Sequence, residues 1–314
     1  RGDMAAPFFV DAAGGGAGTG DGAAEAEAVA AAAVLSELAD VVYPLDDGFL
    51  SDATAARYLR ARGGDVKAAT KMLRTTLLWR PQCLAELNKG SVEQAGGAVA
   101  ASVPRLAMAN CRFCQNTPGF HPMRQVGFDV QGRPILYVAF SQSTNYWFKS
   151  VDAQAHLIPI IENAVLTMTA GVEQFVWVLD YTGFGLGSCN PVQSAVSVKM
   201  LQNHYPERLA KVVCINAPWG FSGFWSAISA FVDPKTRDKV VFCSTDAAFR
   251  DECVTFCSAD MVEWLCTEQR LNKARAMPPS QKAFWAEPPS GDHDPRGEAS
   301  FVAKHVTTFK GVAK

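Results

Sequence analysis

Short apolar runs that alternate with helical segments constrain the fold of this chain more than any other feature. The runs are rich in Val, Ile, Leu and aromatic residues, which is typical of strands buried on both faces of a sheet. The clearest are residues 135–140, 175–179, 212–215 and 240–242. Strand-like runs separated by helical segments indicate parallel pairing within one sheet. The sequence therefore predicts an α/β fold with a mostly parallel sheet.

Two helical segments lie between these runs. Residues 152–171 carry apolar side chains at helical spacing, and Pro159 is expected to bend this helix or to lie near its start. Residues 191–204 form the second helix, with Pro191 in the first turn, where the missing N–H costs no helical hydrogen bond. Each helix can return the chain to the start of the next parallel strand.

Two further helices are predicted ahead of the sheet. Asp52 can cap the first, and the glycine pair at 63–64 ends it. Asp65 can cap the second, which is expected to end near Pro81, because the residue before a proline disfavours helix. The alanine-rich residues 23–38 also favour a helix.

The bulk composition excludes several classes of protein. Hydrophobic residues make up 48% of the chain and the formal net charge is −2, so we expect no nucleic-acid partner. No apolar stretch reaches the roughly 18 residues that cross a bilayer, and the amino terminus does not resemble a secretory signal. Nine cysteines spread over 314 residues favour a reducing compartment over a disulfide framework. We therefore expect a cytoplasmic location.

The stretch from residue 203 to residue 239 is the most informative for function. A carboxylate (Glu207), a hydroxyl (Thr236) and an ammonium (Lys239) flank a mostly apolar segment. This arrangement is poorly suited to bond-breaking chemistry. It suits a site that holds an apolar molecule with a polar end.

Three sequence blocks resemble the CRAL-TRIO (Sec14-like) lipid-transfer family. The first is residues 58–80, which begin Tyr-Leu-Arg-Ala-Arg. The second is residues 129–137, which contain the Gly-Arg-Pro of the family's entry to its first strand. The third is residues 175–239, which include Tyr-Pro-Glu-Arg and Asn-Ala-Pro. The blocks occur in the family's order and together cover about residues 45–250.

Composition and resemblance together divide the chain into four segments. Residues 1–33 are predicted to be a disordered Ala/Gly-rich tail, and residues 276–314 an extended tail punctuated by prolines. The resemblance implies a small helical domain over residues 34–100 and a lipid-binding lobe over residues 101–275. The sheet of this lobe is expected to form the floor of an apolar pocket.

The resemblance also implies a mobile apolar helix that gates the pocket, here residues 221–232. A helix this aromatic is costly to expose to water, so it must cover a core, close a pocket or enter a membrane interface. An ordinary core helix is the alternative. The aromatic and aliphatic residues at near-helical spacing are Phe221, Phe224, Trp225, Ile228 and Phe231.

Six polar-site positions of the phosphatidylinositol-binding members are matched in type. They are Arg62, Asp129, Pro134, Glu207, Thr236 and Lys239. The resemblance implies that Arg62 and Lys239 hold the phosphate, and that Thr236, Asp129 and the Pro134 carbonyl bind inositol hydroxyls. The alternative is structural: Glu207 forms a salt bridge with Lys239 or Arg62 that joins the two domains.

The family's phosphatidylcholine contacts are not matched. The corresponding positions are Gln125, Leu136, Phe175 and Trp177. Large aromatic rings thus replace small hydroxyls at Phe175 and Trp177, and both are expected to line the pocket. We predict phosphatidylinositol binding without matched phosphatidylcholine binding.

The leading hypothesis is a monomeric, non-enzymatic lipid-transfer or lipid-presenting protein that contacts membranes transiently. It requires a bound phospholipid but no other cofactor and no metal: the Cys-x-x-Cys spacing at residues 111–114 lacks a second close pair. One alternative is a binder of a retinoid, tocopherol or sterol. Another is an interaction module with a closed pocket that regulates phosphoinositide signalling.

Overall fold

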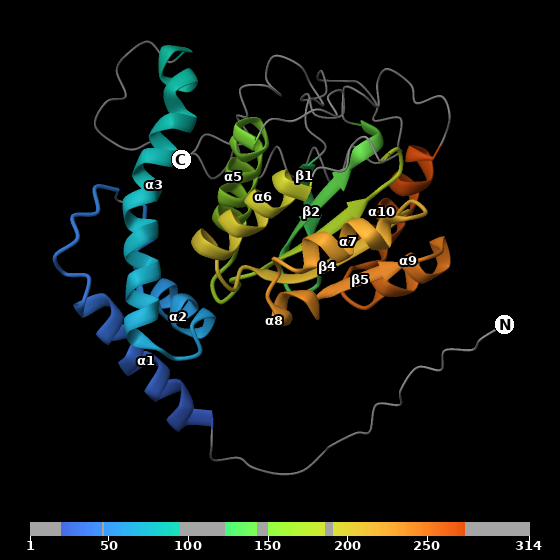
Figure 1. The fold of residues 1–314 in the computed structure, drawn as a ribbon. Coiled ribbons are helices and arrows are strands. Elements are labelled where there is room, and N and C mark those ends of the chain that lie inside the picture. Colours follow the sequence, from blue (N-terminus) through green and yellow to red (C-terminus); the bar gives the residue numbers. More distant parts are fainter. Residues whose placement is uncertain (1–19, 46, 95–122, 143–149, 186–190, 274–314) are drawn as a thin grey trace.

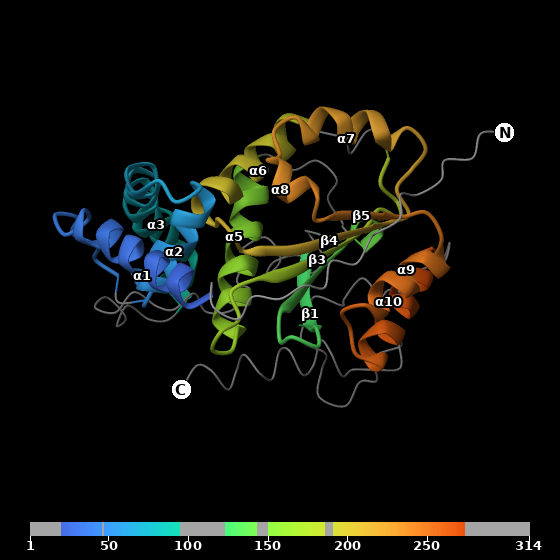
Figure 2. The same ribbon diagram turned by 90° about the horizontal axis from the view of Figure 1, so that it is seen from below.

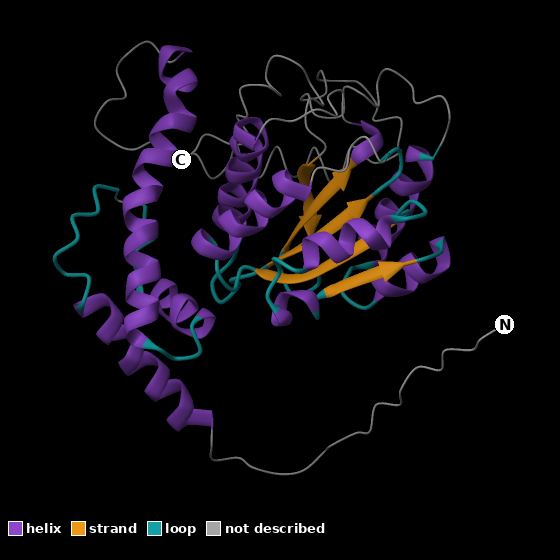
Figure 3. Cartoon of the chain, viewed as in Figure 1, coloured by secondary structure: helices purple, strands orange, loops and turns teal. Residues whose placement is uncertain are grey.

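The chain folds into a small helical domain beside a larger α/β lobe (Figure 1). The computed structural model describes residues 20–45, 47–94, 123–142, 150–185 and 191–273. Within these residues every strand belongs to the lobe (Figure 3). The predicted C-terminal tail, residues 276–314, and the cysteines of the Cys-x-x-Cys spacing lie outside the described residues.

Three helices build the helical domain: α1 (Gly20–Ser36), α2 (Asp52–Ala61) and α3 (Val66–Gln94). Their shared core is apolar and buried, and it includes Val34, Leu38, Tyr58, Leu73 and Leu77. Helix α1 confirms the helix predicted at residues 23–38. It also begins inside the segment predicted to be disordered, because one face of it is buried against α2 and α3.

The ends of α2 and α3 differ in part from the predictions. Ser51, not Asp52, caps α2, since its hydroxyl accepts a hydrogen bond from the Thr54 amide. Asp65 caps α3 as predicted, accepting from the Ala68 amide at 2.9 Å. The predicted end near Pro81 is wrong: α3 continues through it, because residues before and after it are buried and this packing outweighs one lost backbone hydrogen bond.

A five-stranded sheet forms the centre of the lobe. Its strands are β1 (Met123–Phe128), β2 (Pro134–Ala139), β3 (Phe175–Asp180), β4 (Leu209–Ile215) and β5 (Val240–Cys243). They lie side by side in sequence order. β1 pairs antiparallel with β2, and all later neighbours pair in parallel. The predicted α/β fold with a mostly parallel sheet is confirmed, with the unpredicted β1 added at one edge.

Helices cover both faces of the sheet (Figure 2). One face carries α5 (Ser150–Thr167), α6 (Pro191–His204) and α7 (Phe221–Ser229). The helices predicted at residues 152–171 and 191–204 are thus confirmed. Pro159 lies within α5. Two short elements complete this side, the 3-10 turn η1 (Phe140–Gln142) and α8 (Pro234–Arg237).

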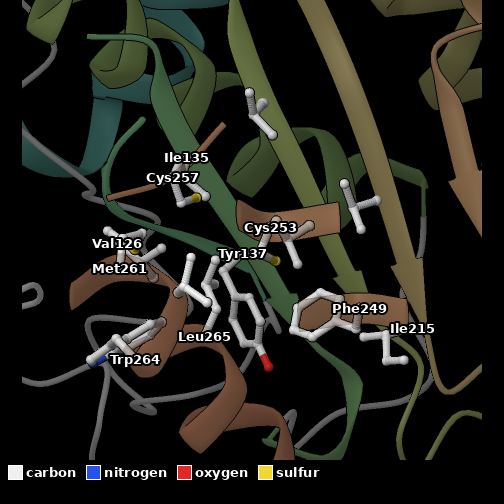
Figure 4. Close-up of a cluster of buried hydrophobic side chains, with 14 of the residues drawn as sticks. Val126, Ile135, Tyr137, Ile215, Phe249, Cys253, Cys257, Met261, Trp264 and Leu265 are labelled. Carbon is white, nitrogen blue, oxygen red and sulfur yellow. The ribbon is translucent and has the colours of Figure 1, made fainter. Parts of the chain in front are cut away.

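The opposite face is covered by α9 (Asp246–Val254) and α10 (Ala259–Asn272), which the sequence analysis did not predict. Their apolar residues pack on the strands to form a densely filled core (Figure 4). Tyr137 and Phe249 are fully buried there. Side chains of this size anchor the lobe, because each removes a large apolar area from water.

Candidate functional site

The two faces of the central strand β3 are filled to different degrees. Val176 and Val178 project toward α9 and α10 and are 0% exposed. Trp177 and Leu179 project to the other face, below α7, and remain half-buried. We call this second side the α7 face. Trp177 and Leu179 therefore keep part of their surface uncovered on the α7 face.

An aromatic cluster lies beneath α7. The ring of Phe221 lies 4.5 Å from that of Tyr181 and 5.4 Å from that of Phe224, between centroids. Phe184 and Phe224 are 5.8 Å apart. These tilted contacts between rings hold α7 over the sheet through dispersion and burial.

The five predicted gate residues differ in burial. Phe221 and Ile228 are buried, whereas Phe224 and Trp225 are half-buried on the same helix. Phe231 lies beyond the end of α7 and is 57% exposed. The helix is therefore shorter than the predicted segment of residues 221–232.

The side chains of Phe175 and Trp177, which were predicted to line the pocket, contact each other. Their rings are 6.2 Å apart in an edge-to-face arrangement. Phe175 is buried under α5 and α6, while Trp177 packs both there and under α7. The two rings thus lie on the α7 face, and their role in lining a pocket stays a prediction.

Polar residues gather at the edge of the sheet where the parallel strands begin, which we call the amino edge. Lys239 immediately precedes β5, and its ammonium donates to the carbonyl of Leu209 at the start of β4, 2.7 Å away. Glu207 lies in the turn before β4 with φ of 57°, a left-handed conformation that is uncommon outside glycine. Its carbonyl accepts a bond from Gln174. Both predicted residues therefore lie at the amino edge.

No salt bridge links Glu207 to Lys239 or Arg62 within the described residues. The structural alternative of an interdomain bridge at Glu207 thus has no contact to support it in this structure. The carboxylate of Glu207 and two of the three N–H groups of Lys239 are left for other partners.

The other lobe residues of the predicted set have local partners. The Thr236 hydroxyl donates to Asp233, which caps α8, at 2.6 Å. Asp129 accepts from the amide and guanidinium of Arg133, so its carboxylate organises the turn between β1 and β2. Pro134 begins β2 and is buried. All three lie at the amino edge, and their roles toward a ligand stay predictions.

Arg62 is exposed at the end of α2, where its guanidinium donates to the carbonyl of Ala61. Helix α2 contacts the lobe through Tyr58, whose hydroxyl donates to the carbonyl of His204 at 3.0 Å. His204 ends α6 just before the turn that carries Glu207. Docking of α2 therefore brings the helix of Arg62 to the same corner of the lobe, without a described contact between Arg62 and the other site residues.

A buried ion cluster that the sequence analysis missed holds the domains together. Arg80 of α3 forms two hydrogen bonds with the Glu162 carboxylate of α5, at 2.5 and 2.6 Å. Tyr205 donates to the same carboxylate, and Asp47 accepts from Arg80. A bidentate, buried pair of this kind is strong only when every group is satisfied, as it is here. The available signal was Arg80 itself, the last residue of the first family block at residues 58–80.

A second group of charges lies next to it. Glu173 receives hydrogen bonds from Arg57 at 2.6 Å and from Arg60 at 2.8 Å. Arg208 donates to the backbone carbonyl of Glu173 instead. Burial and the nearby Arg57 lower the pKa of Arg208 to about 10. These contacts fix the turn before β3 against α2.

A small cavity of about 20 Å³ lies between the two domains. Arg57, Arg80, Arg208 and Glu162 are among its lining residues. This volume holds about one water molecule and is far too small for an acyl chain. The cavity is a polar void of the domain interface, and its lining residues include neither Trp177 nor Leu179.

A polar hub lies at the opposite ends of the strands. Asp180 is 0% exposed and accepts hydrogen bonds from Tyr137, Asn216 and Asn272, at 3.0, 2.9 and 2.7 Å. It thereby joins β2, β3, the loop after β4, and α10. Asn216 adopts a left-handed φ of 60° and begins the loop that leads to α7. The hub positions this loop.

Comparison with known proteins gives consistent matches. Residues 122–262 match the CRAL/TRIO domain. Phosphatidylinositol transfer protein PDR17 of Saccharomyces cerevisiae is 30% identical over 63% of this chain and 55% of its own length. The Sec14 cytosolic factor of Schizosaccharomyces pombe is 25% identical over 61% of this chain and 66% of its own. The chain thus spans only part of these curated relatives.

Among solved structures, Sfh5 aligns with a TM-score of 0.49 at 18% identity, covering 71% of this chain and 80% of that one. A separate property concerns membranes: among the described helices, none combines the length and apolar character that a bilayer-crossing helix needs.

Proposed function

Because the chain belongs to the CRAL-TRIO, Sec14-like family, we propose that it binds a single phosphatidylinositol and exchanges it at membranes. The acyl chains lie in the lobe above the α7 face, and the inositol phosphate lies at the amino edge. The protein works in the cytoplasm as a lipid carrier and not as an enzyme.

The observation that carries this proposal is the unequal filling of the two sides of β3. Residues toward α9 and α10 are sealed, whereas Trp177 and Leu179 remain half-buried beneath an aromatic helix. Apolar surface left exposed to water is unfavourable by about 25 cal/mol per Å², so an apolar ligand that covers it is favoured. Fatty acyl chains supply such a filling.

The amino edge supplies charges for an inositol phosphate. The Lys239 ammonium is held at the start of β4 by one hydrogen bond, which leaves two donors for a phosphate. Glu207 can accept from inositol hydroxyls. Its left-handed backbone fits a functional position, because strain of this kind tends to persist where a side chain must point in a set direction. Arg62 can approach the same corner from α2 and add a second cation.

Exchange requires α7 to move. Its two flanks expose large aromatic rings, with Trp219 at 99% and Phe231 at 57%. Such rings are favoured at the boundary between acyl chains and head groups. Contact with a membrane therefore stabilises an α7 that has swung away from the sheet, and the pocket opens toward the lipid.

The test is transfer of labelled phosphatidylinositol between vesicles. Lys239→Ala should lower the transfer rate by about tenfold, because the loss of one charge-assisted bond costs about 1.5 kcal/mol or more. Lys235→Ala is the matched control, since this lysine is exposed on α8 nearby. A wild-type protein that neither carries nor moves this lipid at any membrane composition contradicts the proposal.

A second candidate ligand is supported by one observation. Phe175 and Trp177 form an edge-to-face pair on the pocket floor, which suits the flat face of a sterol, retinoid or tocopherol ring. Mass spectrometry of the lipid extracted from the purified protein separates the candidates. A ring-shaped ligand in place of phosphatidylinositol would replace the first proposal by the second.

A further inference from the structure

A buried hydrogen-bond donor on the α7 face has no partner among the described residues. The indole nitrogen of Trp177 is inaccessible to water, and no acceptor contacts it among the residues that the structure describes. Buried indole N–H groups usually find an acceptor, and an unsatisfied one costs about 1–3 kcal/mol. A phenylalanine or leucine would fill the same floor without this cost, so the orphaned donor calls for a function.

Trp177 occupies the middle of the α7 face. It pairs with Leu136 of β2 and with Val212 of β4, which places it on the central strand with apolar neighbours on both sides. It packs into the cluster under α5 and α6 and also into the cluster under α7. The side chain remains half-buried although its nitrogen is covered, so another part of it stays accessible on the α7 face.

We propose that the Trp177 indole N–H donates a hydrogen bond to an ester carbonyl of the bound glycerophospholipid and so favours diacyl over ether-linked lipids. This inference rests on the proposed function and specifies its ligand class. In the closed, lipid-free lobe the donor is covered by neighbouring side chains, and the entering lipid displaces them and supplies the acceptor.

The depth of Trp177 within the lobe indicates that the ester carbonyl is the lipid group that accepts its hydrogen bond. The Lys239 ammonium binds the carbonyl of Leu209, and Leu209 pairs with Phe175 at the start of β3. Trp177 lies two residues further along this strand, about 7 Å deeper at the usual rise of a strand. With the phosphate at Lys239, the glycerol esters are the next acceptors along the lipid, because they are only a few bonds from the phosphate. Further along the lipid the acyl chains offer no acceptor.

The experiment is a competition between two forms of the same lipid. Full-length protein is incubated with phosphatidylcholine vesicles that contain equal amounts of diester and diether phosphatidylinositol, and native mass spectrometry gives the ratio bound. In the wild type we expect an excess of the diester form. Trp177→Phe should reduce this ratio by about three- to tenfold, the value of one net hydrogen bond.

Leu179→Ala is the matched control. It removes apolar lining from the same face of the same strand but no donor, so the total lipid bound should fall while the diester-to-diether ratio stays at the wild-type value. If Trp177 had only a structural role, Trp177→Phe would also bind less lipid at an unchanged diester-to-diether ratio. An unchanged ratio in Trp177→Phe therefore overturns the inference.

A measurement on the wild type covers the case in which Trp177→Phe does not fold. In protein labelled with ¹⁵N at the indole nitrogens, one N–H resonance should move downfield with diester but not with diether phosphatidylinositol. Identical indole spectra with the two lipids would overturn the inference and leave the proposed function intact. A wild type that binds neither lipid would overturn both.

Discussion

Trp219 is the most exposed large hydrophobic side chain among the described residues, at 99%, and it immediately precedes Gly220, the N-cap of α7. An indole in water that packs on nothing contributes little to folding, but it gains when it enters a membrane interface. Its place beside α7 therefore supports the proposed contact of α7 with a membrane.

We expect Trp219→Ala to lower binding to lipid vesicles by about tenfold, which corresponds to the burial of part of one indole at about 25 cal/mol per Å². The melting temperature should stay unchanged. Vesicle co-sedimentation and thermal unfolding measure the two effects. Val192→Ala is the control, since Val192 is 73% exposed at the start of α6. Equal losses for both variants would contradict a specific role for Trp219.

Single-residue chemistry was predictable from the sequence only in part. The family resemblance singled out Glu207 and Lys239, and both lie just ahead of parallel strands that begin at one edge. The local hydrogen-bond partners of the polar site residues could not be predicted. Asp129 organises its own turn, and the Thr236 hydroxyl is bound by Asp233, because short polar side chains bond to the nearest available groups.

At the scale of elements, the hub around Asp180 sets how the strand ends meet α10 and the loop before α7. Asp180→Ala would leave the donors of Tyr137, Asn216 and Asn272 without this acceptor in a buried site. We expect a loss of about 3 kcal/mol or more in the free energy of unfolding, measured by urea denaturation. Asp238→Ala, at an exposed position, should cost less than about 0.5 kcal/mol. If Asp180→Ala also lowered the free energy of unfolding by less than about 0.5 kcal/mol, the hub would not hold the loop before α7.

Elements with a clear hydrophobic period were predicted, and those without it were missed. The four parallel strands, α5 and α6 follow from their apolar pattern. The continuation of α3 beyond Pro81 does not, because it depends on the burial of Arg80 and Leu84 in tertiary contacts. β1 was also missed: it contains Arg124 and Gln125, and its place is fixed by pairing with β2.

The whole molecule depends on the buried pair of Arg80 and Glu162, which joins α3 of one domain to α5 of the other. Glu162→Gln keeps the shape but removes the charge, and it leaves Arg80 with Asp47 as its remaining carboxylate partner. We expect a loss of about 3 kcal/mol in the free energy of unfolding. Glu252→Gln breaks the more exposed pair with Lys211 and should cost less than about 1 kcal/mol. Equal costs would contradict a special role for the domain interface.

The same interface predicts a dependence on pH. His204 stacks on Trp79 with ring centroids 3.9 Å apart, and burial lowers its pKa to about 4 from 6.5. Between these values the unfolded chain binds a proton that the folded protein excludes, so stability present above pH 6.5 is lost as the pH falls toward 4.

Because the ring is only half-buried, we expect His204 to account for a loss of only about 1 kcal/mol between roughly pH 7 and pH 5. Urea unfolding of wild type and His204→Asn at both pH values measures this difference. The variant should lose less stability on acidification than the wild type does. A pH dependence that is the same in both would place the titration elsewhere.

The association of the two domains, and the packing beneath α7 within the lobe, could not be read from local sequence patterns, because residues far apart in the chain build both. The most direct test of the central claim is native mass spectrometry of the full chain after incubation with phosphatidylinositol-containing vesicles. We predict one phosphatidylinositol per protein, retained in the wild type and depleted in Lys239→Ala. A wild-type spectrum that shows only lipid-free protein would contradict the claim that this lobe is a carrier for that lipid.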